Sequence, residues 1–331
     1  MKLSRASAFL RSNRKRLIAL TTAFVVLAFV ALNVLAYNHA GAMMRYTDVS
    51  ARTLGPESLG TWEKLKVLLN GVNLPRPVSQ LEPTAMGPET RELSIAIDTG
   101  RDPLTLCAWY NDLGEETPLV IIFHGYSTEK TTLLREAKGM LELGASVLLV
   151  DFRGSGGSSE SYCTVGVHEA RDVAAMVRYA RQQLEHSSIV LFGQSMGAVA
   201  IMRAVHKLDV QPDSIILESV FDSMLNTVRN RFDSMGVPSF PSAELLVFWG
   251  GQQLDFDGFE HDPIQYAASL TCRTLVRHGS EDPRAKISEA RSVFDAVPGP
   301  KTFHEFRDLG HESFLGRRPE EWKAVVSKFL N

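Results

Sequence analysis

The chain has 331 residues, of which 44% are hydrophobic and 22% charged, a composition typical of a globular protein. Six basic residues and no acidic residue precede position 17, so the rest of a chain whose formal net charge is −3 carries −9. So acidic a body argues against a nucleic-acid partner. Three widely spaced cysteines form no metal-ligand cluster; we expect buried thiols, with no metal or other cofactor, at Cys107, Cys163 and Cys272.

An apolar segment without formal charge, residues 17–37, follows the basic residues. As a helix it is about 30 Å long, the thickness of the hydrocarbon core of a bilayer. We interpret it as a transmembrane signal anchor, with residues 1–16 as a basic cytoplasmic tail and the body extracytoplasmic, periplasmic if the source is bacterial. One alternative is a cleaved signal peptide and a secreted body, because small residues at 34–36 and 40–42 resemble cleavage sites. The other is a core helix.

Residues 38–90 are interpreted as a linker. Turn residues interrupt it at Gly55-Pro56 and at 75–77, and residues 62–69 between them predict one amphipathic helix. The sequence leaves open whether this helix packs on the body or on the membrane surface.

The body, residues 91–331, alternates strands with helices. Residues 92–98 and 104–110 predict an antiparallel hairpin around a turn at 100–103. This alternation specifies an α/β fold with a mostly parallel central sheet and helices on both faces. The further strands expected are 119–123, 147–150, 188–192, 214–217, 274–277 and 302–306, and the helices are 131–143, 167–184 and 198–208.

A long insertion breaks the alternation at about 220–265, after the sixth strand. It contains prolines, glycines and the apolar run 245–249. Because ligands bind beside the carboxyl ends of strands in open α/β sheets, we expect a lid over an acyl pocket, with Phe221, Phe248 and Trp249 as pocket residues. The alternative is a helical decoration that buries Phe248 and Trp249 in the body.

Residues 189–200 predict a strand, a sharp turn and a helix, with the pattern G-x-S-x-G at 193–197. We expect strained backbone angles that expose the Oγ of Ser195, and glycines on both sides because a Cβ there would collide with neighbouring elements. Met196 begins the helix, so its unpaired N–H can bind a developing oxyanion. We expect a second such donor in the N–H of Tyr126, in the tight loop after the third strand.

Two further turns place a carboxylate and an imidazole at the same edge of the sheet. Asp282 follows the seventh strand, with Glu281 as the neighbouring alternative. His311 follows the last strand, whereas His304 lies inside that strand, a poor position for a base that moves protons. The chain order Ser195, Asp282, His311 resembles that of the catalytic triad of α/β-hydrolases.

The proposed roles follow from the acidities of these groups. A serine hydroxyl is too weak an acid to attack unaided, so His311 would take the proton of Ser195. Asp282 would hold the tautomer of the imidazole and stabilise its charged form. The sequence therefore predicts a serine hydrolase that cleaves carboxylic esters of small molecules or acyl lipids, or thioesters, through an acyl-enzyme. A serine peptidase and a non-catalytic, membrane-tethered binding module are the alternatives.

The body resembles the α/β-hydrolase superfamily, in its serine-aminopeptidase-like branch. Residues 150–159 are similar to the D-x-R-G-x-G-x-S loop of that family, and residues 164–173 to the helix that follows. The resemblance implies that Asp151 and His124 brace their loops and do not catalyse. Ala198 stands where the prolyl-oligopeptidase pattern has a second glycine, which disfavours a peptidase. The resemblance implies the mechanism better than the substrate, and leaves the oligomeric state open.

Overall fold

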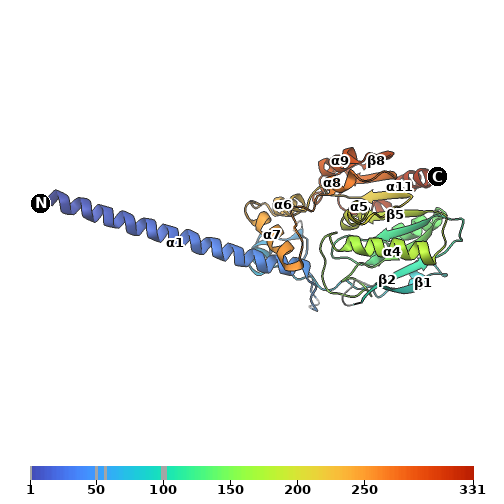
Figure 1. Ribbon diagram of the computed structural model, residues 1–331, viewed down its shortest axis with the longest axis horizontal. Coiled ribbons are helices and arrows are strands. Elements are labelled where there is room, and N and C mark those ends of the chain that lie inside the picture. Colours follow the sequence, from blue (N-terminus) through green and yellow to red (C-terminus); the bar gives the residue numbers. More distant parts are fainter. Residues whose placement is uncertain (1, 49–50, 56–57, 98–102) are drawn as a thin grey trace.

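The computed structural model describes residues 2–48, 51–55, 58–97 and 103–331. A long helix, α1 (Lys2–Met44), projects from a body in which a central sheet lies between helices (Figure 1). The turn expected at 100–103 falls largely outside the described residues, as does Pro56 of the expected Gly55-Pro56 turn.

Eight strands form one sheet in the order β1-β2-β4-β3-β5-β6-β7-β8. The pairs β1–β2 and β2–β4 are antiparallel, and all other neighbours are parallel. The mostly parallel sheet predicted from the sequence is therefore confirmed. The strands are β1 (Arg91–Ile97), β2 (Leu104–Asn111), β3 (Leu119–Phe123), β4 (Ser146–Val150), β5 (Ile189–Gln194), β6 (Ser214–Glu218), β7 (Arg273–Gly279) and β8 (Lys301–Phe306).

Helices cover both faces of the sheet, so the central strands are buried on both sides. In β3, Ile121 packs into the cluster that contains α4 and α5, whereas the next residue, Ile122, packs into the cluster that contains α3 and α11. This alternation explains why the strand reads as a continuous apolar run. The covering helices are α3 (Leu134–Glu142, preceded by the 3₁₀ helix η3, Lys130–Leu133), α4 (Glu169–Gln183), α5 (Met196–Leu208), α9 (Ile287–Ala296), α10 (Phe314–Arg317) and α11 (Pro319–Leu330).

The insertion after β6 folds into three helices, α6 (Met224–Met235), α7 (Ser242–Leu254) and α8 (Pro263–Ala267). Of these, α8 joins the core of the body, where its Tyr266 is fully buried. By contrast, α7 packs along the last part of α1, and α6 packs against α7 (Figure 1).

Between Arg14 and Met44, α1 is long and apolar enough to cross a membrane. The helix continues beyond the expected end at Tyr37, and its last turns contact the body through the buried residues Ala36, Ala40 and Met44.

The linker contains the expected short helix, α2 (Thr61–Asn70), and a 3₁₀ turn, η2 (Pro83–Ala85). The Lys64 ammonium group of α2 donates to the carbonyl oxygens of Ser234 and Met235, each at 3.4 Å. One side of α2 therefore contacts the body, while Trp62 and Leu69 on α2 are 75% and 60% exposed.

Candidate active site

Ser195 lies at the turn between β5 and α5, with φ 52° and ψ −114°. Residues with a Cβ rarely adopt these angles, so the backbone is strained at the serine, as expected. A Cβ on Gly193 would lie 2.5 Å from the backbone N of Ala198, and one on Gly197 would lie 2.3 Å from the carbonyl oxygen of Phe123. Only glycine fits at either position, so the prediction for the two glycines is confirmed.

The loop that carries Tyr126 lies against the serine. A Cβ on Gly125 would be 3.7 Å from the Cβ of Ser195. The backbone N–H of Ser195 donates to the carbonyl oxygen of Glu218 at 2.8 Å, which ties the turn to the end of β6. In the part of the chain that the structure describes, the N–H groups of Tyr126 and Met196 have no acceptor, so both donors are available.

Asp282 and His311 are joined directly. The Nδ1 of His311 donates to the Oδ2 of Asp282 at 2.6 Å, which leaves Nε2 of the imidazole as the nitrogen that can accept a proton. The other oxygen of Asp282 accepts from the backbone N–H groups of Arg284 and Ala285, at 2.8 and 3.0 Å. Asp282 is 4% exposed, whereas Ser195 and His311 are both half-buried and accessible.

The charge of Asp282 is stabilised locally. Burial raises the pKa of its carboxyl group, but the hydrogen bond and charge of His311 and the N–H of Ala285 outweigh this, so the pKa lies below its usual value. A second imidazole, that of His278, is fully buried at 3.8 Å from Asp282 and bonds to the carbonyl oxygen of Ala285 at 2.7 Å. Burial lowers the pKa of His278, so this ring is neutral at pH 7. The sequence had not indicated a role for it.

The alternative acid and base near the proposed pair lie at the surface. Glu281 is exposed, whereas Asp282, the next residue, is buried. His304 lies within β8, and its Nε2 is 2.9 Å from the carboxylate of Glu321 in α11.

Two other candidates for acid and base, His124 after β3 and Asp151 after β4, form hydrogen bonds within and between these two loops. Asp151 is fully buried and accepts from the ammonium group of Lys130 at 2.6 Å and from the N–H of Gly157 at 3.2 Å. The Nε2 of His124 accepts from the N–H of Phe152 at 3.1 Å. Burial lowers the pKa of His124, consistent with a neutral ring that accepts this bond. These contacts agree with the bracing roles that the resemblance implied.

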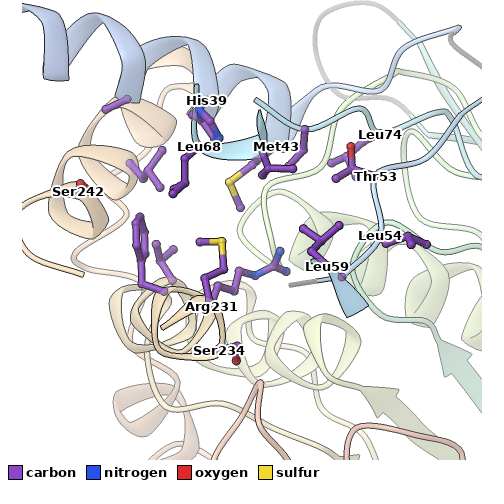
Figure 2. A pocket seen from close by; sticks show the side chains of 18 of the residues that line it. His39, Met43, Thr53, Leu54, Leu59, Leu68, Leu74, Arg231, Ser234 and Ser242 are labelled. Atoms are coloured by element: carbon purple, nitrogen blue, oxygen red, sulfur yellow. The ribbon is translucent and has the colours of Figure 1, made fainter. Parts of the chain in front are cut away.

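An apolar cavity of about 350 Å³ lies between α1, α2, α6 and α7 (Figure 2). Tyr126, which follows Gly125 of the loop beside Ser195, and Arg284, whose backbone N–H donates to Asp282, are among its walls. Figure 2 shows the Arg231 side chain among the groups around it, and this guanidinium stacks 5.0 Å from the centre of the Tyr126 ring. Apolar walls come from all four helices: Leu32 and Leu35 of α1, Val67 and Leu68 of α2, Val228 and Phe232 of α6, and Leu246 of α7.

The three aromatic residues expected in the substrate pocket do not line this cavity. Phe221 is buried in the main core. Trp249 packs edge-on against Tyr37 of α1 at a ring distance of 5.4 Å, and Phe248 is 44% exposed. Helix α7 of the insertion packs against α1. No local pattern in the sequence indicates that these two helices are in contact.

A buried charge cluster that the sequence had not indicated lies beneath the site. Glu218 and Arg277 form a 2.9 Å ion pair, and neither is exposed. Gln194, next to the serine in sequence, donates to Glu218 at 3.2 Å, and Ser313 in the loop after β8 donates to Glu136. Burial raises the pKa of Glu218 to about 7 against the opposing effect of Arg277. The members lie on separate elements, so no spacing along the chain could have indicated them.

No group of residues suited to binding a metal ion is found among those that the structure describes. All three cysteines are free thiols; Cys107 and Cys163 are buried, whereas Cys272 is half-buried.

Comparison with known proteins finds a similar family for part of the body. The profile of the family described as "Serine aminopeptidase, S33" matches residues 114–228, a range that extends from the loop before β3 into α6 and includes the serine turn. The Pyrococcus furiosus esterase Pf2001 has a similar structure, with a TM-score of 0.62 and 23% sequence identity, over 78% of this chain and 98% of the esterase. At this identity the similarity establishes the fold.

Two relatives in sequence span about two thirds of the chain. YqkD, an uncharacterized protein of Bacillus subtilis, is 23% identical over 226 residues, which are 67% of this chain and 74% of YqkD. The lysophosphatidylserine lipase ABHD12 of Gallus gallus is 22% identical over 255 residues, covering 70% of this chain. That match spans 62% of the lipase, less than two thirds of its length.

Proposed function

From the premise that the chain belongs to the α/β-hydrolase superfamily, we propose that it is a membrane-anchored serine hydrolase of carboxylic esters. In this proposal Ser195 is the nucleophile, His311 the general base and Asp282 the acid that orients it. The observation that supports it best is the 2.6 Å hydrogen bond from His311 to the buried Asp282, at the same edge of the parallel strands as a serine held at φ 52°.

The proposed mechanism assigns one step to each group. Nε2 of His311 takes the hydroxyl proton of Ser195 as Oγ attacks the ester carbonyl, and the same nitrogen then gives this proton to the departing alcohol. The N–H groups of Tyr126 and Met196 bind the oxyanion, and each such donor typically lowers the barrier by about 2.7–4 kcal/mol. Water activated by His311 then hydrolyses the acyl-enzyme.

The cavity indicates the class of substrate. A volume of about 350 Å³ and apolar walls suit the acyl chain of a lipid ester, and Tyr126, a proposed oxyanion donor, is one of the lining residues. Arg231 has no carboxylate partner among the described residues, so it offers a positive charge for an acidic headgroup. The name of the relative ABHD12, a lysophosphatidylserine lipase, supports a single-chain acidic lipid as the proposed substrate.

Labelling of the serine tests the catalytic assignment. A fluorophosphonate probe should label the wild-type chain, and Ser195→Ala should abolish the labelling. Labelling that survives in Ser195→Ala would exclude this serine as the nucleophile. A panel of p-nitrophenyl esters and aminoacyl anilides separates the two hydrolase classes, because the family description names a peptidase. Preferential turnover of the anilides would support the peptidase, and turnover of neither would support a binding module.

Filling the cavity tests the acyl-chain site. Val228 lines it from α6, so Val228→Trp should shorten the space for the chain. Each methylene that is no longer buried costs about 0.8 kcal/mol, so kcat/KM for a long-chain ester should fall roughly tenfold or more, while an acetate ester is unaffected. Val78→Trp, at a linker residue that is 58% exposed, is the matched control. Equal losses on long and short esters would place the acyl chain elsewhere.

The proposed location places the N-terminus in the cytoplasm and the catalytic body across the membrane, because six basic residues precede the apolar run. Fusion of a reporter after Asn331 tests this orientation. Active alkaline phosphatase and dark green fluorescent protein are expected. The reverse result would place the body in the cytoplasm.

A further inference from the structure

The segment from the end of α6 to the end of α7, residues 236–254, contains a single charged residue, Glu244. That carboxylate is paired with the guanidinium group of Arg229 at 2.7 Å. The segment nevertheless exposes large apolar side chains, since Phe240 is 76% exposed and Phe248 is 44% exposed. A segment so poor in charge that exposes aromatic rings is unfavourable in water and suited to the interface of a bilayer.

Contacts fix the height of α7 along α1. The indole of Trp249 donates to Asn33 at 3.1 Å, and the side chain of Gln253 donates to the carbonyl oxygen of Tyr37 at 2.8 Å. Leu32 of α1 and Ser242, the first residue of α7, line the same cavity. Thus α7 accompanies α1 from about Leu32 onwards, whereas the apolar run of α1 ends only at Tyr37.

The overlap between α7 and the apolar run of α1 determines how deep the start of α7 lies in the membrane. Residues 32–37 of α1 belong both to the apolar run and to the part that contacts the body. At a rise of about 1.5 Å per residue, six helical residues extend about 9 Å. If residues 17–37 fill the hydrocarbon core, the start of α7 lies about 9 Å below the boundary between hydrocarbon and headgroups. Interfacial helices lie at a similar depth of about 5–10 Å.

We propose that residues 236–254 are a membrane-docking surface, embedded in the leaflet on the C-terminal side of α1 with Phe240 among the acyl chains and Phe248 near the boundary of the hydrocarbon. The inference rests on the proposed role of α1 as a membrane anchor and adds the position of the body to it. Trp249 and Tyr37, stacked edge-on at 5.4 Å, then lie near the headgroups, where such residues are enriched.

The docking surface also determines how the substrate reaches the site. Leu32 and Leu35 lie within the apolar run of α1 and line the same cavity as Tyr126. The cavity therefore extends from the apolar run of α1 to Tyr126, whose backbone N–H is one of the two candidate oxyanion donors. An ester lipid moves from the leaflet into this cavity with its acyl chain out of water throughout.

Depth-dependent fluorescence quenching tests the docking surface without any need for turnover. The full chain with Ser195→Ala and Phe240→Trp is reconstituted in phosphatidylcholine vesicles whose acyl chains are brominated. The emission added by the new tryptophan should be quenched. The matched control is Leu113→Trp: Leu113 is 46% exposed and precedes β3, at the edge of the sheet opposite the insertion, so its emission should not be quenched. Equal quenching of the two, or none of either, would overturn the proposal.

A charge at the same position tests the consequence for the substrate. Phe240→Asp in the otherwise wild-type chain should lower the turnover of a long-chain ester dispersed in vesicles roughly tenfold or more, and leave a soluble short-chain ester unaffected. Leu113→Asp should change neither. Unchanged turnover of the vesicle-bound ester in Phe240→Asp would overturn the docking surface. Quenching at position 240 without hydrolysis of any ester by the wild type would instead reject only the proposed function.

Discussion

The indole Nε1 of Trp249 donates a hydrogen bond to the side-chain oxygen of Asn33 over 3.1 Å and joins the inserted helix α7 to the apolar part of α1. The amide nitrogen of Asn33 donates in turn to the carbonyl oxygen of Phe29 at 2.9 Å. Both polar functions of this asparagine are therefore satisfied inside an otherwise apolar run. The insertion and the N-terminal helix form one unit, so the cavity between them depends on both.

The first prediction concerns this bond. In a medium of low polarity an interhelical hydrogen bond contributes about 0.6–1.7 kcal/mol. A double-mutant cycle of Asn33→Leu and Trp249→Phe should therefore show a coupling energy of that size in the free energy of unfolding of the full chain in lipid. Strictly additive effects would show that the bond does not join the helices.

The second prediction concerns the proposed acid. Asp282→Asn keeps the shape of the side chain but removes the charge that fixes the tautomer of His311, so kcat should fall by on the order of 10⁴ with folding intact. Ester turnover and thermal unfolding of the same preparation measure the two effects.

Glu281→Gln is the control for this change, because Glu281 is exposed while its neighbour is buried. It should leave kcat close to the wild-type value. A crippled Glu281→Gln with an active Asp282→Asn would show that the acid is the other carboxylate.

The third prediction contrasts two glycines. A Cβ on Gly197 would lie 2.3 Å from the backbone oxygen of Phe123, whereas a Cβ on Gly310 would meet nothing closer than 3.7 Å. Gly197→Ala should therefore displace the serine turn and abolish fluorophosphonate labelling, while Gly310→Ala should label normally although it adjoins His311. Normal labelling of Gly197→Ala would contradict the tight turn.

The sequence predicted the sheet and the serine turn because their signals are local. A buried parallel strand reads as an apolar run, and a turn that excludes a Cβ requires its glycines, as Gly193 shows. The insertion was located by its length, but its packing was not predictable. The partner of Trp249 lies more than two hundred residues earlier in the chain, in a segment interpreted only as an anchor.

The buried charges of the body escaped prediction for a related reason. Glu218 ends β6 and Arg277 lies within β7, and these two strands resemble other buried strands in sequence. Their pairing follows from the strand order, in which β6 and β7 are neighbours across an insertion of over fifty residues. Spacing along one strand carries no information about which residues meet across the sheet.

The last prediction concerns Glu289 of α9, which accepts a 2.6 Å hydrogen bond from Asn230 of α6. Burial raises the pKa of this carboxyl group from 4.5 to about 7, although the hydrogen bond opposes the shift. Between these values the folded chain holds a proton that the unfolded chain has released, so the free energy of unfolding decreases as pH rises from about 4.5 to about 7.

Glu289→Gln keeps an oxygen that can accept from Asn230 but has no charge to bury. It should therefore be more stable than the wild type by about 1–2 kcal/mol at about pH 8, a value reduced for partial solvent screening, and should lose this advantage at about pH 4. Urea unfolding at both pH values measures the difference, with the exposed Glu281→Gln as the control. An advantage of the same size at both pH values would show that buried charge is not its cause.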